Sequence, residues 1–135
     1  MNRAVSCLMQ GLMQDWITVG GSNGVLGVTQ PAAGWIDLAA ARDAVFYLEV
    51  SDALGDPAGA LHYETSPTRD PSQFRSMASR ALSASSPSPT PYVQRVTVYD
   101  NPPVPLARWV RWRITYPAAA LWNVTFRINV MAYGR

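Results

Sequence analysis

The clearest feature of this sequence is a strict alternation of apolar and polar residues near its C-terminal end. The apolar positions are Trp122, Val124, Phe126, Ile128 and Val130. The positions between them are polar: Asn123, Thr125, Arg127 and Asn129. A period of two places the apolar side chains on one face of an extended chain. The pattern therefore predicts a half-buried β-strand over residues 122–130.

A second alternating segment lies just before the first, over residues 109–116. One face would carry Val110, Trp112, Ile114 and Tyr116. The other face would carry Trp109, Arg111, Arg113 and Thr115. Residues 117–121, which begin with Pro-Ala-Ala-Ala, separate the two segments, so the sequence predicts an antiparallel hairpin with a short connection.

Shorter runs rich in aromatic and β-branched residues predict further strands at 15–19, 35–38, 44–50, 60–65 and 92–99. Gly, Pro, Asp and Ser punctuate these runs, as in the turn Gly55-Asp56-Pro57. Seven or eight short strands are typical of an all-β protein. We therefore expect a single antiparallel β-sandwich domain over residues 1–135, with a jelly-roll-like arrangement.

Three segments do not follow a strand pattern. Residues 20–27 (GGSNGVLG) predict a turn-rich loop. In residues 70–82, Asp70 as an N-cap and Pro71 at the first helical position predict one or two helical turns. Residues 83–91 (SASSPSPTP) are of low complexity and predict an extended surface loop.

Residues 1–14 have an apolar spacing of four that favours a short amphipathic helix, or an arm that lies on another surface. The residues of this segment that we take as candidates for a partner interface are Leu8, Met9, Leu12 and Met13. Met and Leu adapt well to a partner's groove. A first strand or a frayed terminus is an equal alternative.

Composition narrows the classes of function. The 135 residues suit one domain, and 48% hydrophobic residues with 5 Trp are enough for a core. All 11 basic residues are Arg, but the net charge is only +2, which disfavours nucleic acid as a partner because a phosphate-binding surface needs clustered cations. One Cys excludes an intrachain disulfide and a Cys-based zinc site. The sequence shows no secretory signal or apolar stretch long enough to span a membrane, so we expect a cytoplasmic product without a membrane partner.

Candidate chemistry is sparse. His62 lies within a predicted strand between Leu61 and Tyr63, which favours a structural role over that of a general base. Asp43, Asp52 and Asp56 could gather at one end of the sandwich around a calcium ion, although no spaced ligand motif supports it. We therefore predict no catalytic residue, cofactor or metal, and expect a protein that is not an enzyme.

The exposed face of residues 109–115 carries arginine beside tryptophan, the composition of an interface hot region. The candidate interface residues, which we expect to form a stripe on one common outer face, are Trp109, Arg111, Arg113, Arg127 and Arg95. The alternative is a solvated cross-strand ladder in which these arginines pair with carboxylates. The carboxylates available for such a ladder are Glu49, Glu64 and Asp100. The sequence leaves both readings open.

Four segments together carry a resemblance to a known group of proteins. They are 44–51 (AVFYLEVS), 61–70 (LHYETSPTRD), 108–115 (RWVRWRIT) and 122–130 (WNVTFRINV). Their order resembles that of small β-sandwich accessory proteins of tailed-phage particles and phage-derived assemblies. The similarity spans about residues 35–132, and the N-terminal segment and the Gly-rich loop have no counterpart in it.

The resemblance implies a non-enzymatic structural component of a phage virion or phage-like particle, such as a capsid decoration protein or a minor tail protein. Its partners would then be capsid or tail proteins, and it would form a homo-oligomer or a symmetric array. Such a protein assembles in the host cytoplasm and ends on the particle surface. The alternative is a carbohydrate-binding module with Trp35, Trp109 or Tyr133 as the stacking platform.

Overall fold

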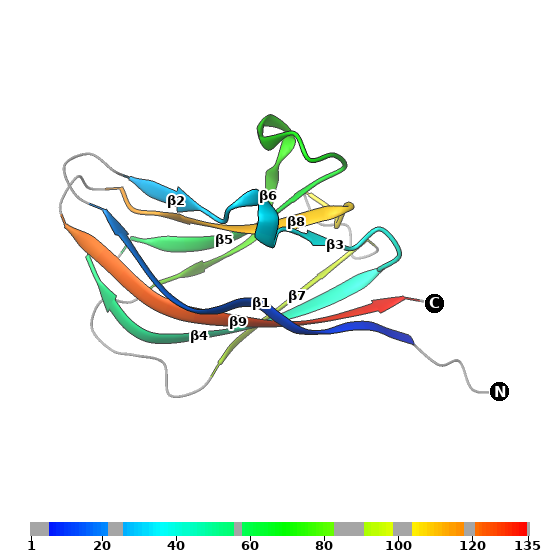
Figure 1. The fold of residues 1–135 in the computed structure, drawn as a ribbon, viewed down its shortest axis with the longest axis horizontal. Helices are drawn as coiled ribbons and strands as arrows, with labels where there is room; N and C mark the ends of the chain where they lie inside the picture. Colours follow the sequence, from blue (N-terminus) through cyan, green and yellow to red (C-terminus); the bar gives the residue numbers. More distant parts are fainter. Residues whose placement is uncertain are drawn as a thin grey trace.

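The structure is a computed structural model that describes residues 6–21, 26–55, 58–82, 91–98, 104–117 and 121–134. Its strands form two antiparallel sheets that pack face to face (Figure 1). The four-stranded sheet has the order β1 (Ser6–Gly21), β9 (Trp122–Gly134), β4 (Asp43–Leu54) and β7 (Tyr92–Thr97). The five-stranded sheet has the order β2 (Gly27–Thr29), β8 (Trp109–Thr115), β5 (Ala60–Ser66) and β6 (Arg75–Ala81), and β3 (Ile36–Asp37) also pairs with β8.

This topology confirms the predicted all-β sandwich. If the two-residue β3 is set aside, the strands form two sheets in jelly-roll order, in which the first strand lies beside the last. The described residues hold nine strands, against the predicted seven or eight. The additional ones are β2 and β6, two strands at the outer edges of the five-stranded sheet.

The predicted hairpin between residues 109–116 and 122–130 is wrong. Both segments are strands, but β8 pairs with β5 and β9 pairs with β1 and β4, so they belong to different sheets. Their apolar faces meet across the sandwich instead. Trp112 packs edge-on against Phe126 with ring centroids 5.0 Å apart, and Tyr116 stacks on Trp122 at 4.5 Å. Burial of these rings between the two sheets favours this arrangement over a hairpin within one sheet.

The helix or arm expected over residues 1–14 is also corrected, because residues 6–21 form strand β1. β1 pairs with β9 from Ser6 opposite Gly134 to Gly21 opposite Trp122, with three shifts of register on the way. A helix of this length is marginal in water, and Gly11 lowers its stability further. The hydrogen bonds to β9 therefore decide the conformation, and the alternative of a first strand is confirmed for residues 6–14.

The helical turns expected over residues 70–82 are confirmed only at their start. A 3-10 helix covers Pro71–Gln73, and the Asp70 carboxylate accepts a hydrogen bond from the Ser72 backbone N–H at 2.9 Å. From Arg75 the chain is strand β6, because it pairs with β5. Most of the predicted loop 83–91 and residues 22–25 of the loop 20–27 lie outside the described residues.

Gln30 links the two sheets at the edge where β1 and β2 lie. It is 2% exposed, and its side-chain Nε2 donates to the backbone oxygens of Met13 at 3.1 Å and Gly34 at 2.9 Å. Its Oε1 accepts from the Trp112 backbone N–H at 3.3 Å. Its backbone oxygen accepts from the Trp35 indole N–H at 2.8 Å. One amide side chain thus satisfies backbone groups of β1, β8 and the 3-10 helix Ala32–Gly34.

The Tyr116 hydroxyl is buried without a hydrogen-bond partner among the described residues, and burial raises the pKa of this phenol. Removing an unsatisfied buried hydroxyl abolishes a desolvation penalty. We expect Tyr116→Phe to leave the free energy of unfolding unchanged or to raise it by about 1 kcal/mol. Urea denaturation checks this, and a loss of stability beyond the error of the fit would show that the hydroxyl has a partner.

Candidate binding surfaces

Trp109, Arg111 and Arg113 lie on β8, where the two arginines share the carboxylate of Glu64 on the neighbouring β5. Arg111 Nε donates to Oε1 at 2.9 Å, and Arg113 Nε donates to Oε2 at 2.6 Å. Glu64 is 4% exposed and Arg111 is 8% exposed, so this ion triplet is largely buried. Arg111 and Arg113 therefore pair with a carboxylate across the strands, as in the expected ladder, but the ladder was expected to be solvated and Glu64 and Arg111 are buried. Asp100 lies outside the described residues.

Aromatic rings and further cations cover the same triplet. Trp35 and Phe74 pack with centroids 4.7 Å apart, and the Arg111 guanidinium lies 4.0 Å from the Phe74 ring. The Arg69 guanidinium lies 5.4 Å from the Trp35 ring and 4.6 Å from the Trp109 ring. Through these contacts, residues 69–74 pack against the outer surface of the five-stranded sheet. Trp35 is 9% exposed, so its ring offers little surface for a sugar.

Arg127 and Arg95 do not share that face, which corrects the expectation of one common stripe. They lie on β9 and β7 of the other sheet, because β8 and β9 are not hairpin partners. Arg127 Nη2 donates to both carboxylate oxygens of Glu49, at 2.7 and 2.9 Å. Arg95 Nε donates to both carboxylate oxygens of Asp43, at 3.0 and 2.9 Å. Each arginine thus spans two neighbouring strands.

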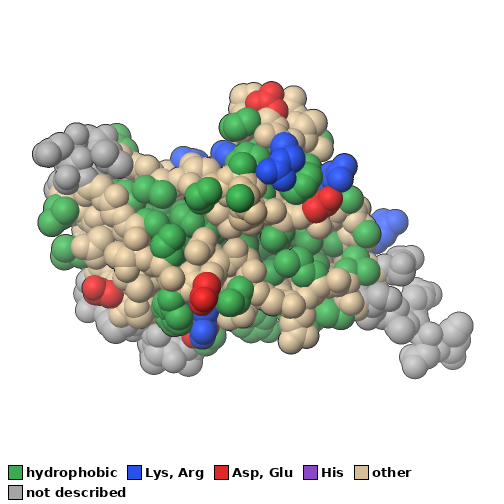
Figure 2. All heavy atoms as spheres, in the orientation of Figure 1, with side chains coloured by type: hydrophobic (Ala, Val, Ile, Leu, Met, Phe, Trp, Pro, Cys, Tyr) green, Lys and Arg blue, Asp and Glu red, His purple; other side chains and the backbone are tan. Residues whose placement is uncertain are grey.

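The four N-terminal candidates divide into exposed and buried pairs along β1. Leu8 is 46% exposed and Leu12 is 47% exposed. Met13 is 4% exposed, and Met9 packs partly buried against the core. The apolar side chains spread along the face that β1 crosses in Figure 2. Half of the predicted set is therefore available at the surface, and half belongs to the sandwich interior.

Trp16 extends this exposed row and was missed by the sequence analysis. It is 44% exposed, and the Arg127 guanidinium lies 4.9 Å from its ring. Residues 15–19 were predicted to be a strand, but the shifts of register in β1 change which side chains face outward. A simple period of two does not carry that information.

The outer face of the four-stranded sheet, the face turned away from the other sheet, is hollowed between β1, β9 and β4. The depression has a volume of about 510 Å³. The side chains that line it and that matter below are Gln10, Tyr47, Glu49, Asn129 and Met131. These residues come from strands that are distant in the chain, so the sequence alone does not bring them together.

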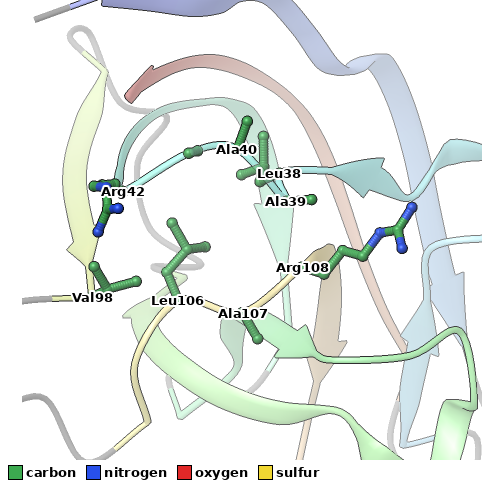
Figure 3. Close-up of a pocket in the computed structure, with 9 residues that line it drawn as sticks. Leu38, Ala39, Ala40, Arg42, Val98, Leu106, Ala107 and Arg108 are labelled. Atoms are coloured by element: carbon green, nitrogen blue, oxygen red, sulfur yellow. The ribbon is translucent and has the colours of Figure 1, made fainter. Parts of the chain in front are cut away.

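A second hollow, of about 440 Å³, lies where the chain leaves β3 and where it approaches β8 (Figure 3). Its lining is mainly small and apolar, with Leu38 and Leu106 belonging to the core. Arg42 and Arg108 stand at opposite ends, and Arg108 extends away from the other lining residues to pair with Asp37 at 2.9 Å. The polar side chains of its lining are the two arginines, Arg42 and Arg108.

His62 lies on β5 and is held by hydroxyl groups. Its Nε2 is 3.0 Å from Thr115 Oγ1, and its Nδ1 is 3.5 Å from Ser76 Oγ. Burial, followed by the positive charge of Arg113, lowers the pKa of His62 below its usual range. The imidazole is therefore neutral near pH 7, in keeping with a hydrogen-bonded residue of the sheet.

The described residues contain no group of three His, Cys, Asp or Glu side chains placed to hold a metal ion. Of the three aspartates considered for calcium, Asp43 is bound by Arg95, and Asp56 lies outside the described residues. Tyr133, the third sugar platform suggested by the sequence, lies on β9 and donates its hydroxyl to the Met131 sulfur at 3.5 Å. Among the described residues, no helix is long and apolar enough to cross a membrane.

Comparison with known proteins gives one structural likeness. No family model matches the chain, and no curated protein matches it. A solved structure described as the K2 cleaved adhesin domain of Lys-gingipain is similar at 14% sequence identity with a TM-score of 0.46. The likeness covers 90% of this chain and 84% of that one.

Proposed function

We propose that this protein is a non-catalytic structural component of a phage virion or phage-derived particle, and that it docks on the particle through strand β1. The observation that carries the proposal is the row of exposed large apolar side chains along this edge strand, Leu8, Leu12 and Trp16. Each is between 44% and 47% exposed, which is unusual for three such residues on one strand.

The position of these residues favours a protein partner. β1 pairs with β9 on one side and forms the outer edge of the four-stranded sheet in the described part of the chain. Leu12 lies opposite Asn129, a residue of the outward-facing set of β9, so its side chain points away from the core. Trp at a protein surface is a frequent anchor of an interface. In a symmetric array, many copies of a modest contact would supply avidity.

The resemblance noted in the sequence supports the same class of function. Its four segments fall on β4, β5, β8 and β9, the strands that form the centre of the sandwich. The docking row lies on β1, outside the segments that carry the resemblance. The framework would then be shared with particle proteins, while the contact surface would be particular to this chain.

The first test is sedimentation of an extract from the native source, with detection of this chain in each fraction. We expect it to migrate with a particle in the megadalton range. Migration as a free chain of 14.8 kDa would contradict the proposal.

A variant test then addresses the surface. We expect the double variant Leu12→Gln, Trp16→Gln to reduce binding to the particle at least tenfold, or about 1.4 kcal/mol, because its apolar contact is lost. Val93→Gln is the matched control, since Val93 is 59% exposed on β7 at the opposite edge of the same sheet. Equal binding by the double variant and the control would exclude β1 as the docking surface.

A further inference from the structure

We infer that the depression on the outer face of the four-stranded sheet is a binding site for a neutral carbohydrate. This inference does not rest on the docking proposal, although both use the outer face of the four-stranded sheet, where Leu12 lies opposite Asn129. Its volume of about 510 Å³ is within the range of small-molecule sites. The side chains at its centre come from neighbouring strands, since Asn129 on β9 lies opposite both Leu12 on β1 and Tyr47 on β4. The sheet therefore fixes their relative positions.

The polar groups of the depression suit a ligand with many hydroxyls. Gln10 and Asn129 each supply an amide, which donates and accepts hydrogen bonds. Glu49 supplies a carboxylate that Arg127 holds through contacts at 2.7, 2.9 and 3.0 Å. The Asn129 Nδ2 is 3.5 Å from the same carboxylate. Acceptors held in place in this way lose little freedom when a ligand binds.

Charge and apolar surface narrow the class of ligand further. The bidentate contact with Arg127 balances the negative charge of Glu49, and among the residues that the structure describes no other charged side chain lines the depression. A charge-balanced site gives no advantage to a phosphate or a carboxylate. The ring of Tyr47 and the side chain of Met131 add apolar surface beside these polar groups. An aromatic ring next to amides and a carboxylate matches a pyranose, which has an apolar C–H face and a rim of hydroxyls.

The test is a titration of the isotope-labelled full chain, followed by NMR. The neutral probes are the methyl glycosides of glucose, galactose, mannose and N-acetylglucosamine. The charged probes are glucuronate and glucose 6-phosphate. We expect saturable shifts from at least one neutral glycoside at residues around Tyr47 and Asn129, and weaker binding of both charged sugars.

Matched variants locate the site. Tyr47→Ala and Asn129→Ala are each expected to weaken binding about tenfold. Asn123→Ala is the control, because Asn123 faces outward on β9 but does not line the depression. A well-dispersed spectrum for each variant establishes that it folds. If one of the two site variants does not fold, the other still tests the site.

Three outcomes would overturn the inference. One is the absence of shifts with every neutral glycoside. Another is tighter binding of a charged sugar, which would exclude a neutral ligand. The third is unchanged affinity in both Tyr47→Ala and Asn129→Ala. The titration uses the isolated chain, so failure of docking to a particle would leave its result unaffected.

Discussion

Replacing Glu64 with alanine is expected to destabilise the protein by about 3–5 kcal/mol. Its carboxylate is shared by Arg111 and Arg113, and Arg111 is packed against Phe74 with little access to water. Removing the carboxylate leaves a buried positive charge without a partner. Urea denaturation monitored by tryptophan fluorescence measures the free energy of unfolding directly.

A second substitution tests whether the loss of stability comes from the Arg111 charge that is left without a partner. In Glu64→Ala, Arg111→Met both the carboxylate and the buried cation are gone, and we expect most of the lost stability to return. The exposed pair of Arg108 and Asp37 gives the comparison: Asp37→Ala should lower the stability far less than Glu64→Ala does, because the pair is solvated. A loss below about 1 kcal/mol for Glu64→Ala would mean that the triplet is not desolvated in solution.

The second large effect is expected at Gln30. In Gln30→Glu, the carboxylate has no N–H to donate to the backbone oxygens of Met13 and Gly34, and a buried charge faces two acceptors. We expect a loss of about 3 kcal/mol or more near neutral pH. Burial raises the folded-state pKa of this new carboxyl above its unfolded value. The stability relative to wild type is therefore highest below the unfolded pKa and falls as pH rises through the folded pKa.

The pH dependence distinguishes this explanation from a simple packing defect. Gln30→Met removes the same hydrogen bonds without adding a titratable group, so its loss relative to wild type should not vary over the same range of pH. Thermal unfolding of both variants at several acidic and neutral pH values makes the comparison. Parallel profiles for Gln30→Glu and Gln30→Met would contradict the role assigned to the Gln30 amide.

The fold class could be predicted because the sequences of the central strands have a clear period of two. β4 and β9 alternate buried and partly exposed residues over most of their length, which is the period that a half-buried strand requires. Which strands pair could not be predicted in the same way. Alternation tells that Trp112 and Phe126 are both inward, but it does not tell whether they are side by side in one sheet or opposed across two. The two segments are close in the chain, which led to the wrong prediction that they pair as a hairpin.

The positions of the candidate surface residues could not be predicted either, because they depend on which strands pair. Arg111 and Arg127 both stand at outward positions of their strands, yet the crossing between sheets places them on opposite faces of the molecule. The partner of Arg111 was among the three carboxylates considered, but sequence spacing could not choose Glu64. The exposure of Trp16 could not be predicted, because β1 contains shifts of register that local composition does not reveal. The depression around Tyr47 and Asn129 exists only once β4 and β9 are adjacent.

The pairing of the first strand with the last has a consequence for how the protein is made. Ser6 lies opposite Gly134, and the two ends of the described chain leave the sandwich at the same corner (Figure 1). β1 therefore has no partner until β9 has left the ribosome, and its apolar side chains stay exposed throughout synthesis. Because so many contacts join distant parts of the chain, folding should be slow, on the order of milliseconds to seconds. During that interval the apolar side chains of β1 lack the strand that they pack beside in the folded protein.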